Sequence, residues 1–282
     1  MQVIAERPGE PVEEEPGFDS HAPHLVDRWR NGASSHVVDA VAEEIPVAMV
    51  YNGVSHAVML ATPTRLEEFG LGFSLSEGIL NERRELYDIE IVRQAEGLEL
   101  QMSISQERFA ALKQKRRNLA GRTGCGLCGA ESLQQVIRQP KPVISSLRIS
   151  PQTIHRAFEQ LAKLQTLQAI TGAVHAAAWA SPDSSILHME EDIGRHNALD
   201  KLIGSMARNN TRTELGFAVI TSRASYEMVQ KTAAVGIPLL AAISAPTGLA
   251  IELAKQAGIT LIGFARHDNH VVYANPQRLE HL

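Results

Sequence analysis

Apolar residues fall along the chain in short runs that predict strands first and a regular strand–helix alternation later. Near the N-terminal end, apolar runs at 48–51 and 57–60 flank Asn52-Gly53, which is a strong signal for a hairpin turn. Thr64 followed by Glu67 forms a capping-box pattern that predicts a helix just after Thr64. Two further strands at 89–92 and 98–102, and a basic helix at 107–117, complete a β-rich α+β region.

Ser150-Pro151 opens a second region, because Ser is a favoured helix cap and Pro a favoured first helical residue. Ile154, Phe158 and Leu161 recur at helical spacing behind it. Strands are then predicted at 185–189, 217–221, 238–243, 260–264 and 270–273, and helices at 172–178, 195–207, 226–234 and 247–257. This alternation predicts an α/β fold with a mostly parallel sheet and flanking helices.

Composition and charge add domain limits and exclude some classes of function. Residues 1–20 hold the acidic excess and three prolines, so a disordered acidic tail is predicted over 1–30. The remaining domains are predicted at 31–120 (N-terminal α+β), 121–149 (cysteine loop and linker) and 150–282 (α/β). The remainder of the chain has no basic excess, which argues against nucleic acid as a partner. Without a signal peptide or an 18-residue apolar run, we expect no membrane association and a cytoplasmic location.

The two cysteines of the chain are Cys125 and Cys128, and glycines flank the pair. Two cysteines cannot form a disulfide framework or a four-thiolate zinc site. Three interpretations stay open: sulfur chemistry on an accessible loop, half of a Cys/His zinc site, and a redox pair. Nearby basic residues would favour the ionised thiolate form of these cysteines. Alternatively, those residues would simply form a solvent-exposed face of a helix. We predict no metal site.

Three polar segments follow predicted strands, where open α/β sheets bind ligands. The first holds Arg195, His196 and Asn197, which would suit an anion at a helix N-terminus, although Asp192 could merely cap that helix. The second holds Ser222 and Arg223, which could donate hydrogen bonds to a phosphate. Alternatively, Ser222 or Ser225 could simply cap the following helix. The third is a possible polar turn that contains Phe264, Ala265, Arg266, His267, Asp268 and Asn269.

His175 lies in a run of small residues, where a histidine can be either a packed residue or a ligand. A zinc-dependent deaminase needs His-x-Glu and a later Pro-Cys-x-x-Cys. Ala177 occupies the position of that glutamate, and no cysteine follows His175. Hydrolytic deamination is therefore excluded.

Several motifs together resemble the FdhD family of sulfurtransferase accessory proteins for formate dehydrogenase. The resemblance covers about residues 36–278, and its most specific run is Asp-Ile-Gly-Arg-His-Asn-Ala-Leu-Asp-Lys at 192–201. The other matching runs are Gly-Cys-Gly-Leu-Cys-Gly at 124–129, Thr-Gly-Ala-Val-His-Ala-Ala at 171–177, Thr-Ser-Arg-Ala-Ser at 221–225 with Gln-Lys at 230–231, Ser-Ala-Pro-Thr at 244–247 and Leu-Ile-Gly-Phe-Ala-Arg at 261–266.

The resemblance implies a sulfur relay with a cysteine persulfide intermediate. Cys125 would take sulfur from a cysteine desulfurase, and Cys128 would assist delivery to the Mo-bis(molybdopterin guanine dinucleotide) cofactor, or its tungsten counterpart. The apoenzyme of formate dehydrogenase would receive that cofactor. The resemblance also implies a core similar to the cytidine-deaminase fold, a homodimer, and nucleotide contacts from residues 264–269. Two alternatives remain, a non-catalytic cofactor chaperone and a zinc or redox CxxC protein.

Overall fold

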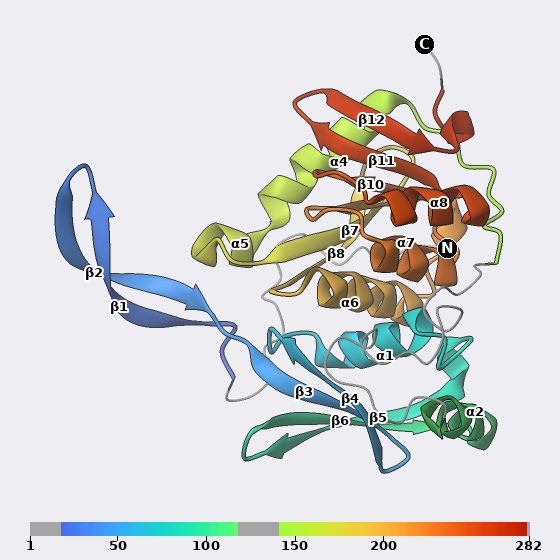
Figure 1. Ribbon diagram of the computed structural model, residues 1–282, viewed down its shortest axis with the longest axis horizontal. Helices are drawn as coiled ribbons and strands as arrows, with labels where there is room; N and C mark the ends of the chain where they lie inside the picture. Colours follow the sequence, from blue (N-terminus) through green and yellow to red (C-terminus); the bar gives the residue numbers. More distant parts are fainter. Residues whose placement is uncertain (1–17, 118–140, 281–282) are drawn as a thin grey trace.

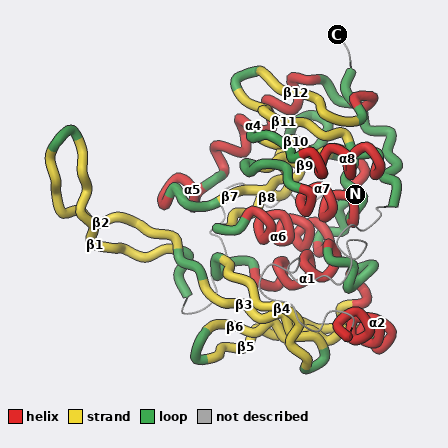
Figure 2. Tube along the Cα trace, viewed as in Figure 1, coloured by secondary structure: helices red, strands yellow, loops and turns green. Residues whose placement is uncertain are grey.

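The computed structural model describes residues 18–117 and 141–280, which form two stacked regions and a projecting arm (Figures 1 and 2). The arm and a four-stranded sheet belong to the N-terminal half, and a six-stranded sheet belongs to the C-terminal half. Cys125 and Cys128, and most of the predicted linker at 121–149, lie outside the described residues.

The arm is an antiparallel ribbon made of β1 (His21–Arg30) and β2 (Ala33–Ala42), which pair along their whole length. Asn31 and Gly32 join the strands, both at positive φ, the conformation that a tight hairpin turn requires. The prediction of a disordered tail over 1–30 is therefore wrong for residues 21–30. The acidic composition behind that prediction belongs to residues 1–20, of which 1–17 lie outside the described residues.

The four-stranded sheet has the order β4-β3-β6-β5, and α1 (Leu66–Ser76) packs on its inner face. Asn52-Gly53 forms the predicted hairpin turn, with both residues at positive φ. The predicted helix begins at Leu66, but Arg65 at its N-cap makes no side-chain capping bond. The capping role predicted for Thr64 is wrong, because its hydroxyl instead accepts a hydrogen bond from Lys201 at 3.3 Å. The elements are β3 (Ile45–Tyr51), β4 (Val54–Ala61), α1 (Leu66–Ser76), β5 (Leu86–Gln94), β6 (Gly97–Ile104) and α2 (Gln106–Arg117).

The six-stranded sheet has the order β12-β11-β10-β9-β7-β8 and is mixed rather than mostly parallel. Only β9, β10 and β11 pair in parallel, whereas β7, β8 and β12 pair antiparallel with their neighbours. The helix predicted at 172–178 is wrong. Residues 175–178 instead begin β7, whose alternate residues pack into the two core clusters on opposite faces of the sheet, Ala176 and Ala178 on one face and Ala177 on the other. The strands are β7 (His175–Ala180), β8 (Ile186–Asp192), β9 (Phe217–Ile220), β10 (Leu239–Ala242), β11 (Thr260–Arg266) and β12 (Asn269–Ala274).

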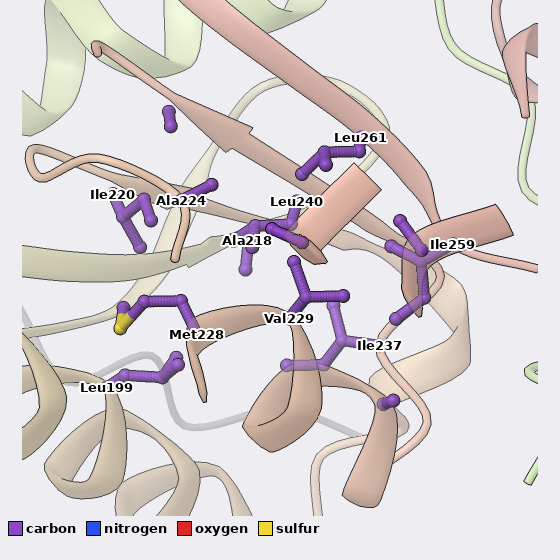
Figure 3. Packing of buried hydrophobic residues seen from close by; sticks show 14 of the residues in the cluster. Leu199, Ala218, Ile220, Ala224, Met228, Val229, Ile237, Leu240, Ile259 and Leu261 are labelled. Atoms are coloured by element: carbon purple, nitrogen blue, oxygen red, sulfur yellow. The ribbon is translucent and has the colours of Figure 1, made fainter. Parts of the chain in front are cut away.

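Helices cover both faces of this sheet, as the strand–helix alternation predicted. One face packs on α4 (Pro151–Leu164), which is followed by the short α5 (Thr166–Thr171). The other face packs on α6 (Arg195–Arg208), α7 (Tyr226–Ala234) and α8 (Gly248–Ala257). Figure 3 shows Met228 of α7 between Ile220 of the sheet and Leu199 of α6. Ser150 caps α4, as predicted, and Gly258 ends α8 in the left-handed conformation.

The two regions are joined where α1 crosses α6 at very short range. A Cβ on Gly204 would lie 1.9 Å from the carbonyl oxygen of Glu68, and one on Gly72 would lie 1.7 Å from that of Asp200. Only glycine therefore fits at these two positions. The close approach brings polar groups of both regions into one buried contact layer beside the C-terminal sheet.

Two buried lysines connect the regions within this layer. Lys201 is fully buried and lies 2.7 Å from Asp192, and it also donates to the carbonyl oxygen of Thr62 at 3.0 Å. Lys231 donates to both carboxylate oxygens of Asp200 at 2.9 Å and to Glu77 at 3.0 Å. We call these two groups the lysine clamps, and each joins the N-terminal region to the C-terminal one.

Candidate functional site

Four strands of the C-terminal sheet, β8 to β11, run in one direction and end at one edge, where β7 begins. Backbone hydrogen bonds join the loops at this edge: Thr247 donates to Ala224 at 3.1 Å, and Phe264 donates to Ser244 at 3.3 Å. The loop that follows β9 and the end of β11 are therefore linked through the loop after β10. The ion pair between His196 and Glu227 brings the turn after β8 beside the start of α7, which follows the β9 loop. These are the three polar segments that the sequence placed after strands. We call this edge the sheet-edge site.

His175 stands at the centre of the edge, at the first position of β7. Its Nδ1 lies 3.5 Å from the hydroxyl of Thr221, which follows β9. The same hydroxyl accepts a hydrogen bond from the backbone N–H of Ala176 at 2.9 Å, so Thr221 is fixed in place. Burial, together with the nearby Arg195 cation, lowers the pKa of His175. The imidazole is therefore neutral at pH 7 and can accept a hydrogen bond.

The turn after β8 supplies Arg195 and His196 from the start of α6. His196 Nε2 lies 2.9 Å from a carboxylate oxygen of Glu227 on α7. This pairing lowers the pKa of Glu227, to which Arg195 also contributes. The Nε of Arg195 is buried and makes no hydrogen bond within the described part of the chain. Glu227 is a site residue that the sequence did not indicate, because its partner lies on another helix.

Phe264 and Arg266 are aimed at the edge by a bulge in β11. The register between β11 and β12 shifts between Gly263 and Arg266, and Phe264 has a φ of 53°. Positive φ at a bulky residue is rare, and such strain concentrates at functional sites. Phe264 is 38% exposed, and the guanidinium carbon of Arg266 lies 6.0 Å from its ring centroid. Gly263 permits this, because a Cβ there would lie 2.8 Å from Pro246.

The rest of the third segment forms the hairpin turn between β11 and β12. His267 and Asp268 both have positive φ, so the interpretation of this part as a polar turn is correct for the backbone. Ala265 is buried, while Asn269 begins β12 and is exposed. The predicted cofactor contacts of residues 265 and 267–269 stay predictions.

The second polar segment, at 221–225, exposes the cation of Arg223, and its serines make no helix-capping hydrogen bond. Arg223 is exposed, whereas Ser222 is buried and its hydroxyl donates to the carbonyl oxygen of Arg223 at 3.1 Å. Ser225 occupies the N-cap position of α7, but its side chain makes no capping bond. The alternative that these serines only cap a helix therefore does not explain the segment.

Asn197 turns inward rather than toward the edge. It is 3% exposed, and its amide donates to the carbonyl oxygen of Leu60 at 2.7 Å and to Asp192 at 2.9 Å. Asp192 also accepts from the backbone N–H of Gly194 at 2.8 Å, so it holds the turn that presents Arg195. The side chain of Asn197 is thus occupied by structural contacts, and the run at 192–201 serves both the site and the lysine clamps.

The sheet-edge site is suited to an anion with an aromatic part. Arg195, Arg223 and Arg266 supply guanidinium groups that can pair with phosphate oxygens. Phe264 offers a ring face, and neutral His175 offers an acceptor. No group of three His, Cys, Asp or Glu side chains suitable for a metal ion exists within residues 18–117 and 141–280.

The family model described as the FdhD/NarQ family matches residues 42–280, which is most of the chain. The chain belongs to the FdhD/NarQ family. It is 56% identical to the "Sulfur carrier protein FdhD" of Cupriavidus necator over 93% of this chain and 91% of that protein. It is also 56% identical to the protein of that name from Xanthomonas euvesicatoria, over 90% of this chain and 91% of the relative.

A solved structure also shares the fold of this FdhD/NarQ family member. The structure is described as a putative formate dehydrogenase accessory protein from Desulfotalea psychrophila. It superimposes with a TM-score of 0.74 and covers 93% of this chain and all of that one, at 22% sequence identity. Among the described residues, no helix combines the length and apolar character needed to cross a bilayer.

Proposed function

We propose that this chain is a sulfur carrier that transfers persulfide sulfur to a molybdenum cofactor on behalf of formate dehydrogenase. The observation that carries the proposal is the 56% identity, over 93% of the chain, with a protein named for sulfur carriage. The donor would be a cysteine desulfurase and the client the apo-dehydrogenase. We expect this transfer to occur in the cytoplasm.

Cys125 would carry the sulfur, and Cys128 would assist its release. The Cys125 thiolate attacks the terminal sulfur of the donor's persulfide; the donor's S–S bond breaks and its thiolate leaves. For delivery, the Cys128 thiolate attacks Cys125, the terminal sulfur leaves as sulfide to the cofactor, and a Cys125–Cys128 disulfide remains. A thiol reductant must then reduce that disulfide before the next cycle.

The cargo would be the Mo-bis(molybdopterin guanine dinucleotide) cofactor, whose metal belongs to the cargo and not to this protein. Its guanine and pyrophosphate groups match the chemistry of the sheet-edge site. The ring of Phe264 would stack on the base, and Arg266, Arg223 and Arg195 would bind the phosphates. The arrangement of these cations on one edge supports this assignment.

The decisive experiment is the intact-protein mass after incubation with an active cysteine desulfurase and cysteine. We expect a reducible gain of one sulfur atom in the wild type and in Cys128→Ala, and none in Cys125→Ala. Sulfur that persists in Cys125→Ala but not in Cys128→Ala would reverse the two roles. No gain in any variant would refute carriage and favour a cofactor chaperone, and stoichiometric zinc in protein purified without chelator would favour a metal site.

A further inference from the structure

Two histidines, His155 of α4 and His270 of β12, form a pair that has no part in the sheet-edge site. The Nε2 of His155 lies 3.1 Å from the Nδ1 of His270, which is within hydrogen-bond distance. The ring centroids are 5.1 Å apart, and the ring planes are inclined by 38°. The two residues are 115 positions apart in the chain, so no motif spacing in the sequence indicates the pair.

Regular secondary structure holds each ring of this pair in place. His155 is 9% exposed, and its neighbours Ile154 and Phe158 on α4 pack into the core against the sheet. His270 is the second residue of β12, and Val272 packs into the same core. Residues two apart in a strand project from the same face, so His270 also faces α4. The packing of α4 on the sheet therefore brings the two rings together.

The spacing of the two nitrogens suits a shared metal ion as well as a shared proton. Unlike His196, which pairs with Glu227, neither ring forms an ion pair within the described part of the chain. Imidazole nitrogens are good ligands for Zn²⁺, Ni²⁺ and Cu²⁺. Two nitrogens on one tetrahedral Zn²⁺ lie roughly 3.3 Å apart, because each Zn–N bond is about 2.0 Å long. The observed 3.1 Å differs from that separation by only about 0.2 Å.

We propose that His155 and His270 form a two-imidazole site for an exchangeable divalent transition metal ion such as Zn²⁺. The ion takes the place of the shared proton, and the ring that donates this proton carries it on its other nitrogen instead. Both rings thus stay neutral, and no proton is released. No third His, Cys, Asp or Glu completes the site within residues 18–117 and 141–280, so water fills the other coordination positions. With half the protein ligands of a structural zinc site, the ion exchanges readily.

An ion at this position fastens the β11–β12 hairpin onto α4. β12 is an edge strand that pairs only with β11, and the register of that pairing is irregular. His270 directly follows Asn269, the first residue of β12, so the metal restrains the hairpin close to its turn. Because the ion binds the folded chain, it raises the stability of the protein as its concentration exceeds the dissociation constant. This inference does not depend on sulfur transfer.

Calorimetric titration with ZnCl₂ tests the site on the full chain without a histidine tag. Cys125→Ala and Cys128→Ala are present in every sample, so that no thiolate binds the metal. One Zn²⁺ per chain is expected, and no Mg²⁺, because Mg²⁺ prefers oxygen ligands. His270→Gln and His155→Gln should each weaken Zn²⁺ binding by at least about tenfold. His36→Gln, which removes an exposed imidazole from the arm, is the matched control and should leave the affinity unchanged.

Thermal unfolding and amide hydrogen exchange give a second measurement on the same samples. Zn²⁺ should raise the thermal midpoint of the cysteine-free chain and slow amide exchange over residues 264–274, and His270→Gln should remove both effects. The midpoint of His270→Gln without metal shows whether this more exposed variant folds, even if the buried His155→Gln does not. Absence of Zn²⁺ binding, binding that survives His270→Gln, or a loss that follows His36→Gln would overturn the proposal.

Discussion

Replacing Lys231 with Met should destabilise the protein strongly, because it removes the charge at the centre of one lysine clamp. Lys231 is 7% exposed and Asp200 1%, and the two carboxylate oxygens lie 2.9 Å from the ammonium. Methionine keeps most of the volume, so the loss is electrostatic. Asp200 would keep a hydrogen bond from Ser76 at 2.6 Å, but no cation. Breaking a buried pair in this way costs about 3–5 kcal/mol.

The size of that loss can be measured by denaturant unfolding against a matched control. Lys255→Met removes an exposed pair, in which Lys255 and Glu252 are 53% and 62% exposed, and should cost at most about 1 kcal/mol. If Lys231→Met loses no more than the control, the clamp contributes nothing and the reasoning is wrong. The double variant Lys231→Met, Asp200→Leu should recover part of the loss, because it also removes the stranded carboxylate.

Three further changes have expected outcomes that separate packing, ionisation and ligand binding. Gly204→Ala should cost several kcal/mol in thermal unfolding, since its Cβ would meet backbone at 1.9 Å, whereas Gly248→Ala, with nothing within 4 Å, should be nearly neutral. Burial raises the pKa of Glu190 to about 7, so the wild type loses stability as pH rises from the unfolded value of 4.5 towards 7. The free energy of unfolding of Glu190→Gln, relative to that of the wild type, should therefore rise by up to about 3 kcal/mol between pH 5 and 8. A difference that stays constant over this range would contradict the reasoning. Arg266→Ala should weaken GDP binding in calorimetry by about tenfold or more, while Lys255→Ala should not change it.

The sequence predicted the strand–helix alternation of the C-terminal half well, because its apolar runs are separated by caps and turns that act locally. Ser150-Pro151 marks the start of a helix by its own chemistry, and α4 begins where expected. The alanines at 172–178 predict a helix, because alanine favours helices when no tertiary contact intervenes. The place of this segment between β8 and β9 in the sheet overrides that preference. The direction of each strand likewise cannot be predicted from the local sequence pattern.

The placement of the candidate site's cations at one edge of the sheet could be predicted, because these cations follow strands and the sequence shows where strands end. What could not be predicted is the direction of each side chain. Asn197 and Arg195 are two residues apart, yet Asn197 points into the contact with Leu60 while Arg195 serves the edge. Glu227 and Thr221 acquire their roles from partners on other elements, His196 and His175. Such pairings depend on the tertiary structure alone.

The α1–α6 crossing has a consequence for how this protein can be recombined with its relatives. Gly72 of α1 packs directly on the backbone of α6, and Gly204 of α6 packs directly on the backbone of α1. Asp200 of α6 accepts hydrogen bonds from both Ser76 and Lys231. A chimera that takes residues 42–117 from one relative and 141–280 from another inherits half of each contact. Such hybrids should fold only when both parents share these residues, so the two halves are expected to be inherited as one unit and not exchanged as modules.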